Sequence, residues 1–173
     1  ALASAYLAAR WAGGDSLSLP AGAGVTRNWT RQLTSNSPFV RGNTLAVNPL
    51  LRSTAWCVIG ATLYRSRDDG ETWTSPGSIV AQSRANAFVI SPKDTNVFVM
   101  AAVTSTGQRV VKRSVDAGGT WSTRLNEVFG EYGVPLEQRP DQPDTLLFGG
   151  ENDVLQRSTD GGVTMSSQGI VDD

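Results

Sequence analysis

Residues 63–73 read Leu-Tyr-Arg-Ser-Arg-Asp-Asp-Gly-Glu-Thr-Trp, and this stretch returns twice further along the chain. The copies are Val-Lys-Arg-Ser-Val-Asp-Ala-Gly-Gly-Thr-Trp at 111–121 and Leu-Gln-Arg-Ser-Thr-Asp-Gly-Gly-Val-Thr-Met at 155–165. All three share the pattern apolar-x-Arg-Ser-x-Asp-x-Gly-x-Thr, and two of them end in Trp. Self-similarity at a spacing of about 45 residues predicts a repeat protein.

The residues upstream of each copy also repeat. Leu-Ala-Val-Asn-Pro at 45–49 matches Phe-Val-Ile-Ser-Pro at 88–92, and each is followed by a second apolar run. The third copy keeps Arg-Pro-Asp at 139–141 and then an apolar run at 145–149. Each unit therefore reads as strand, turn, strand, strand, tight turn, strand. Four short strands in about 45 residues is the size of a β-propeller blade.

A further unit is indicated before the first full copy. Residues 28–33 resemble residues 120–125, so we expect them to form the last strand of an incomplete blade. The predicted fold class is all-β: an incomplete β-propeller of about three four-stranded blades plus a partial fourth, with a short N-terminal arm. The arm covers residues 1–27 and is either helical or extended. The propeller-like domain covers residues 28–173, with repeats at about 45–73, 88–121 and 134–165.

The Ala-rich start of the chain has two interpretations. Residues 1–9 form either a short helix or the trimmed end of an export signal, because small residues resemble a cleavage site. The second interpretation predicts a periplasmic or extracellular protein.

The pattern Ser-x-Asp-x-Gly-x-Thr-Trp resembles the Asp-box, or BNR, repeat. Such repeats are found in sialidases, xyloglucan-degrading glycosidases, sortilin-type receptors and photosystem assembly factors. The resemblance covers roughly residues 28–173, and it implies a β-propeller. In these families the box lies at the periphery of the propeller, away from the ligand face.

The chemistry of the box residues is mainly structural. The Asp and Ser side chains accept hydrogen bonds from N–H groups of the turn, and the Gly supplies a positive φ. We expect the Thr to begin the next strand and the Trp to pack between neighbouring sheets. The structural set is Ser66, Asp68, Gly70, Thr72, Trp73, Ser114, Asp116, Gly118, Thr120, Trp121, Ser158, Asp160, Gly162 and Thr164.

Arg65, Arg113 and Arg157 recur just before each box. They form either an anion-binding ring or one surface position repeated by duplication. We favour the second interpretation, since repeated residues occupy equivalent places on different blades.

Composition excludes several classes of function. The net charge is −1 and basic residues are spread along the chain, so nucleic acid is not an expected partner. The absence of His removes His-based catalysis and His metal ligands. Cys57 lies in an apolar run and is expected to be a buried hydrophobe. The sequence predicts no metal, no cofactor and no transmembrane span.

The segment 126–144 is the part least explained by the repeat. It carries acids that, as a pair, could serve a glycosidase. Sialidases also need an Arg-Ile-Pro-type segment, for which residues 39–42 are a poor substitute. We therefore identify no catalytic residue and interpret the segment as a partner contact. The residues expected at this contact are Glu127, Glu131, Tyr132 and Glu137.

Two functions follow from these observations. The first is a non-enzymatic binding or scaffold subunit that docks on a partner protein complex, similar to the photosystem-associated Asp-box proteins. Its open sheet edges would be covered by that partner or by self-association, and carbohydrate is a further class of ligand. The alternative is a fragment of a polysaccharide-active glycoside hydrolase or sialidase.

Overall fold

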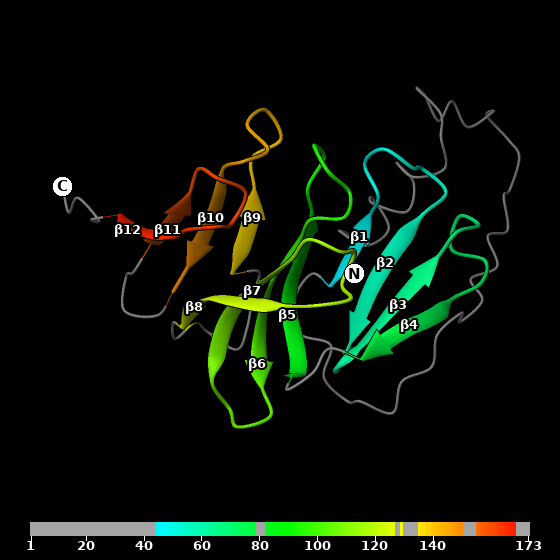
Figure 1. Ribbon diagram of the computed structural model, residues 1–173, viewed down its shortest axis with the longest axis horizontal. Helices are drawn as coiled ribbons and strands as arrows, with labels where there is room; N and C mark the ends of the chain where they lie inside the picture. Colours follow the sequence, from blue (N-terminus) through cyan, green and yellow to red (C-terminus); the bar gives the residue numbers. More distant parts are fainter. Residues whose placement is uncertain (1–43, 79–81, 127–128, 130–134, 151–154, 169–173) are drawn as a thin grey trace, which may run out of the picture. The chain divides into compact units, whose positions relative to one another are not determined.

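The computed structural model describes residues 44–78, 82–126, 129, 135–150 and 155–168, which all belong to the compact unit spanning residues 32–173. The described residues form twelve β-strands in three four-stranded antiparallel sheets (Figure 1). The prediction of an all-β fold with three four-stranded units is therefore confirmed. The expected N-terminal arm and partial fourth unit lie outside the described residues. No helix of the described residues is long and apolar enough to cross a membrane.

Each sheet is one sequence repeat, and its strands are adjacent in chain order. Sheet 1 contains β1 (Leu45–Val47), β2 (Ala55–Ile59), β3 (Thr62–Ser66) and β4 (Thr74–Ser78). Sheet 2 contains β5 (Gln82–Ile90), β6 (Phe98–Thr104), β7 (Arg109–Ser114) and β8 (Ser122–Asn126). Sheet 3 contains β9 (Leu136–Gln138), β10 (Leu146–Gly149), β11 (Leu155–Ser158) and β12 (Ser166–Gln168).

The loop between the first and second strands has the same backbone in all three sheets. It spans 48–54, 91–97 and 139–145, and the N–H of its first residue donates to the carbonyl of its last. The three N···O distances are 2.8, 2.9 and 3.0 Å for Asn48–Thr54, Ser91–Val97 and Arg139–Thr145. The sequence repeat is thus also a repeat of hydrogen bonds, down to the loops.

Sheet 2 lies between the other two and is buried on both faces. Side chains along β6 alternate between two hydrophobic clusters. Phe98, Met100 and Ala102 pack with residues of sheet 1, whereas Val99, Ala101 and Val103 pack with residues of sheet 3. A strand covered on both sides is expected to be a continuous apolar run, and β6 reads Phe-Val-Met-Ala-Ala-Val-Thr.

Aromatic rings form the centre of each cluster. Phe98 contacts Trp56 of sheet 1 edge-on, with ring centroids 5.0 Å apart, and Phe88 in the same way at 5.2 Å. In the second cluster Phe129 meets Phe148 of sheet 3 at 5.6 Å. Full burial of one such side chain contributes about 1.5–3 kcal/mol, so these rings help to hold neighbouring sheets together.

The first strands of the three sheets contact one another in sequence, β1 with β5 and β5 with β9. The fourth strands β4, β8 and β12 end each sheet on the opposite edge. Sheets that share one inner line of first strands have the arrangement of propeller blades.

Candidate functional site

The tight turn between the third and fourth strands of each sheet carries the pattern that recurs three times in the sequence. We call these segments the box turns: residues 66–73, 114–121 and 158–165. In the second, Ser114 Oγ donates to Asp116 Oδ1 at 2.7 Å and accepts from the N–H of Gly118 at 2.9 Å. Asp116 in turn accepts from the N–H and the hydroxyl of Thr120, at 2.8 and 2.7 Å. The two side chains thereby replace the backbone partners that a turn of this length lacks.

The first and third box turns repeat this network. Ser66 and Ser158 accept from the N–H groups of Gly70 and Gly162, both at 2.9 Å. The carboxylate of Asp160 accepts from the N–H of Val163 and from the N–H and hydroxyl of Thr164. In the first and second turns the indole N–H of Trp73 and Trp121 closes the turn on the carbonyl of Gly70 and Gly118, at 3.0 Å in both cases.

Hydrogen bonding keeps the box carboxylates ionised. The N–H and the hydroxyl of Thr120, with the hydroxyl of Ser114, lower the pKa of Asp116 to about 2. Partial burial acts to raise the pKa of Asp160, but bonds from Thr164 and Ser158 outweigh it and bring that pKa to about 2. The pKa of Asp68 is also lowered, mainly by the hydrogen bond from the Thr72 hydroxyl. A carboxyl group held in this form is a poor proton donor near neutral pH.

Two successive residues of each box turn adopt a left-handed backbone. They are Asp69 (φ 59°) and Gly70 (φ 89°), Ala117 (φ 54°) and Gly118 (φ 87°), and Gly161 (φ 68°) and Gly162 (φ 82°). Positive φ at both central positions suits the twist of a hairpin. The first of each pair also donates its N–H to the preceding loop: Asp69 to Ser53, Ala117 to Asn96 and Gly161 to Asp144. Box turn and first loop are therefore fastened together at the same end of every sheet.

The structure places the box threonines before the fourth strand rather than at its start. β4, β8 and β12 begin two residues after the threonines, at Thr74, Ser122 and Ser166. The prediction that Thr begins the strand was therefore wrong by two residues. The physical reason is that both the N–H and the hydroxyl of this Thr are bound to the box Asp, which holds it in the turn.

Of the box tryptophans, Trp121 contacts the core between sheets 1 and 2 and lies 6.4 Å from Phe98, centroid to centroid. Met165, at the equivalent position of the third turn, packs against the cluster between sheets 2 and 3. Trp73 is half-buried in the first turn. In sheets 2 and 3, this position therefore faces the interface with the preceding sheet. We call the interface between two neighbouring sheets a seam.

The three arginines before the boxes do not form a common anion site. Arg113 Nε donates to the carbonyl of Gly161 in the next box turn, at 2.9 Å. Arg65 instead lies over the ring of Trp56, 5.3 Å from its centroid, and its buried Nε makes no hydrogen bond within the described residues. Arg157 is half-buried on sheet 3. The Arg113 contact shows that this position can join neighbouring sheets.

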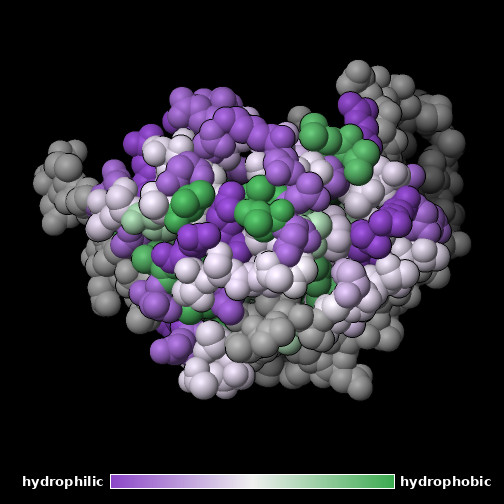
Figure 2. All heavy atoms as spheres, in the orientation of Figure 1, coloured by the Kyte–Doolittle hydropathy of each residue, from purple (hydrophilic) through white to green (hydrophobic). Residues whose placement is uncertain are grey.

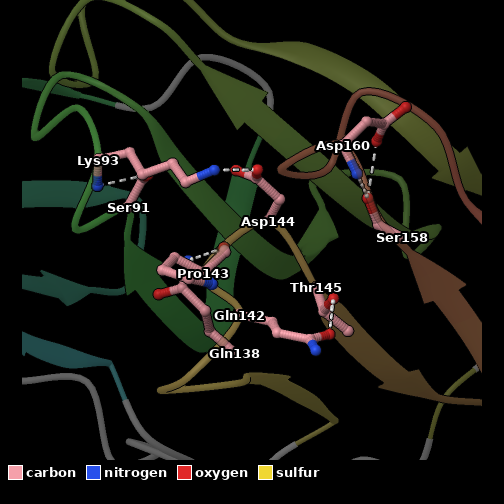
Figure 3. Close-up of polar contacts among 9 residues, drawn as sticks. All are labelled: Ser91, Lys93, Gln138, Gln142, Pro143, Asp144, Thr145, Ser158 and Asp160. Atoms are coloured by element: carbon pink, nitrogen blue, oxygen red, sulfur yellow. Dashed lines mark hydrogen bonds and ion pairs between the residues drawn. The ribbon is translucent and has the colours of Figure 1, made fainter.

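The acids of the segment 126–144 are only partly described. Glu127, Glu131 and Tyr132 lie outside the described residues, and Glu137 is exposed on β9. Asp141 forms an ion pair with Arg139, and the hydrogen bond from Arg139 lowers the pKa of Asp141. Asp144 forms an ion pair with Lys93 of sheet 2 (Figure 3). In the same view Gln138 donates to the carbonyl of Pro143 at 2.7 Å. The described carboxylates of this segment, Glu137 apart, are bound to neighbours.

No group of His, Cys, Asp and Glu side chains among the described residues could hold a metal ion. Cys57 is half-buried, and burial raises the pKa of its thiol to about 11 despite a hydrogen bond with Thr44. The thiol is therefore uncharged near neutral pH and is not suited to nucleophilic chemistry.

Comparison with known proteins identifies the fold of this chain but no protein family. No protein-family model matches the sequence, and no curated protein is similar to it. Solved structures are similar: the GH74 enzyme of Niastella koreensis has 20% identity and a TM-score of 0.55, over 71% of this chain and 17% of that one. The GH74 xyloglucanase of Xanthomonas campestris has 22% identity and a TM-score of 0.55, over 73% of this chain and 20% of that one.

YCF48 of Cyanidioschyzon merolae is also similar, with 17% identity and a TM-score of 0.50, over 75% of this chain and 38% of that one. The chain therefore spans a fifth or less of the two GH74 proteins and less than two fifths of YCF48. At these identities the likeness establishes the fold. The chain is an incomplete β-propeller, and its sheets 1 to 3 are blades.

Proposed function

We propose that this chain is an Asp-box propeller module that binds a partner protein and scaffolds an assembly, rather than a catalyst. The observation that carries the proposal is a set of exposed apolar side chains at the box end of the sheets. Leu50 and Leu51 stand in the first loop of sheet 1, 62% and 58% exposed. Val115 and Val163 are exposed in the second and third box turns.

These side chains share one end of the sheets because the box turns are hydrogen-bonded to the first loops. Figure 2 shows the hydrophobic residues of one face of the molecule as separate patches among hydrophilic ones. Apolar anchors within a polar surround are typical of transient protein interfaces. A continuous apolar surface would instead be an aggregation hazard.

The described carboxylates favour binding over hydrolysis. A glycosidase needs one carboxyl group that is protonated near neutral pH. The box aspartates are held ionised at a low pKa, and Asp141 and Asp144 are occupied by Arg139 and Lys93. The segment that contains Glu127, Glu131, Tyr132 and Glu137 remains part of the proposal as a second contact.

The test compares three forms of the purified chain as bait in an extract of the source organism. The variant Leu50→Asp/Leu51→Asp places two charges at the box end. The matched control, Ser105→Asp/Gln108→Asp, places two charges in the exposed β6–β7 hairpin at the other end. We expect one protein to be retained by the wild type and the control, to be lost with the Leu variant, and to bind directly once purified.

Two results would contradict the proposal. One is equal retention of that protein by the Leu50→Asp/Leu51→Asp form. The other is release of reducing sugar from xyloglucan by the purified chain, which would support the hydrolase alternative.

A further inference from the structure

Two buried nitrogen donors on paired strands of sheet 1 have no hydrogen-bond acceptor. Trp56 is 4% exposed and belongs to the core between sheets 1 and 2, yet its Nε1 has no partner within the described residues. The same holds for Nε of Arg65, the strand partner of Trp56. Buried donors that make no hydrogen bond are rare in folded proteins, so this pair calls for an explanation.

The repeat shows what an arginine at this position does elsewhere. Arg113 donates its Nε across the next seam to the carbonyl of Gly161 at 2.9 Å. The equivalent acceptor for Arg65 is the carbonyl of Ala117, which has the same left-handed backbone as Gly161 (φ 54° and 68°). Arg65 makes no such bond, because its guanidinium lies over the ring of Trp56, 5.3 Å from the centroid. Trp56 therefore diverts Arg65 from the seam contact that Arg113 makes.

The stacked guanidinium has a geometry that suits an anion with two oxygen atoms. The ring beneath it is fixed by Phe98, which meets Trp56 edge-on with centroids 5.0 Å apart. Of the guanidinium nitrogens, only Nε is buried without a partner. The Nη groups, which make no hydrogen bond within the described residues, are therefore open to solvent. A stacked arginine loses little freedom when its planar fork binds two oxygens of one anion.

The charges around Arg65 favour an anion with a single charge. Burial and, secondarily, the charge of Arg67 lower the pKa of Arg65, so the two guanidinium groups are close together. Neither forms an ion pair within the described residues, although Asp69 and Glu71 are exposed acids of the same box turn. Asp68 is bound within its own turn. These acids repel a doubly charged phosphate more strongly than a carboxylate.

We propose that Arg65 and Trp56 form a carboxylate-binding site at the box end of the seam between sheets 1 and 2. The carboxylate accepts from the guanidinium fork of Arg65 and from Nε1 of Trp56. The site lies at the box end because Trp56 comes two residues after the first loop and Arg65 directly precedes the box turn. Both donors face a seam between two described sheets.

The carboxylate has two possible sources. One is a side chain of a protein that docks beside Leu50 and Leu51, which stand in the first loop of the same sheet. The other is a free organic acid. The site does not depend on the proposed function, because a free acid can fill it where no partner protein docks.

Nuclear magnetic resonance of the isotope-labelled chain tests the site, with sodium acetate as the probe and sodium chloride at equal ionic strength as the blank. Trp56→Phe identifies the indole signal of Trp56. We expect acetate to move that signal downfield with a millimolar dissociation constant, since a small anion makes few contacts. The indole N–H groups of Trp73 and Trp121 are bound to carbonyls of their own turns and serve as internal controls. A Trp56 signal that stays fixed in about 100 mM acetate, or indole signals that all move alike, would overturn the proposal.

A matched pair of variants tests the role of the arginine. Arg65→Lys keeps the charge but removes the planar fork, and we expect it to weaken acetate binding at least about tenfold. Arg124→Lys, at an exposed position of β8, is the control and should bind as the wild type does. Circular dichroism and a thermal melt show whether each variant folds, and the wild-type titration decides if Arg65→Lys does not. Equal acetate affinities of Arg65→Lys and the wild type, or tighter binding of phosphate than of acetate, would overturn the proposal.

Two probes distinguish the sources of the carboxylate. Acetate stands for a free acid, and the blocked dipeptide acetyl-Leu-Glu-amide stands for a protein carboxylate beside an apolar side chain. If a partner protein supplies the group, the dipeptide binds at least about fivefold tighter than acetate, and Leu50→Ser/Leu51→Ser removes the gain. Equal binding of the two probes assigns the site to a free acid. The Leu50→Ser/Leu51→Ser form should still bind acetate, so failure of the partner site and failure of the carboxylate site are separate results.

Discussion

The Nε of Arg113 donates to the carbonyl oxygen of Gly161 at 2.9 Å, across the seam between sheets 2 and 3. Gly161 is in the left-handed region, and this backbone directs its N–H to the carbonyl of Asp144. One residue of the third box turn thus joins its own first loop to the preceding sheet. The box turn is therefore a part of the seam and not only a closure of its hairpin.

Replacing Arg113 by Ala is expected to lower the free energy of unfolding by about 1–3 kcal/mol, because a partly buried charge-assisted hydrogen bond is lost. Urea titration followed by tryptophan fluorescence measures the change. Arg124→Ala, on the exposed part of β8, is the matched control and should lie within about 0.5 kcal/mol of the wild type. Equal effects of the two substitutions would show that the seam contact contributes nothing.

The glycine of the second box turn has a second constraint besides its backbone. A Cβ on Gly118 (φ 87°) would lie 2.5 Å from Leu63 Cδ2 of sheet 1, whereas a Cβ on Gly107 (φ 85°) has no atom within 4 Å. Both Ala variants incur the cost of positive φ, about 1–2 kcal/mol. We expect Gly118→Ala to destabilise by about 1–3 kcal/mol more than Gly107→Ala, since only it overpacks a seam. Similar melting curves for the two variants would refute this.

Much of the fold could be predicted from the sequence because the repeat makes every element appear three times. The box pattern located the tight turns, and the loops and strands followed from the spacing. What the repeat could not give was the partner of each side chain. Arg65 and Arg113 occupy the same position of the repeat, yet Arg65 stacks on Trp56 and Arg113 binds Gly161. The difference arises because the strand partner of Arg65 is Trp56, whereas the strand partner of Arg113 is Val99.

The backbone conformation of the box turns could likewise be predicted only in part from the sequence. The second residue of each left-handed pair is Gly in all three turns, so its positive φ could be expected. The first is Asp69, Ala117 or Gly161, and Ala gives no signal of a left-handed backbone. The hydrogen bonds to Ser53, Asn96 and Asp144 hold that residue there, and they depend on contacts that a single sequence does not display.

The low pKa of the box aspartates predicts a pH dependence of stability. Asp116 has a pKa of about 2 in the folded chain, below its ordinary value of 3.8, so the folded state binds its proton less readily. Its contribution to stability is complete above pH 4 and is lost as the pH falls toward 2. Urea titrations at several pH values should show a shallower loss in this range for Asp116→Asn than for the wild type. Parallel losses would contradict the assignment.

The reactivity of the Cys57 thiol reports on unfolding of the structure around it. Burial raises its pKa from 9.0 to about 11, which leaves about a hundredfold less thiolate at pH 8 than in the unfolded chain. A thiol reagent should therefore react with the native protein at least about a hundredfold more slowly than with the protein in urea. The control is Ser75→Cys in a Cys57→Ala background, because Ser75 is exposed on β4. Comparable native rates for both cysteines would mean that the thiol of Cys57 is accessible.

The third box turn offers a gain in stability. Trp73 and Trp121 each close their turn on the carbonyl of the box glycine, and Met165 stands in the same position, packed against the seam between sheets 2 and 3. A Trp there can donate its N–H to the carbonyl of Gly162 and enlarge the contact with the seam. We expect Met165→Trp to raise the free energy of unfolding by about 0.5–2 kcal/mol, measured by urea titration. Met165→Leu separates bulk from hydrogen bonding and should lie close to the wild type. A lower stability of the Trp variant would mean that the seam beside Val99 is too narrow for an indole. Met165 would then be the residue that fits this turn better than a Trp does.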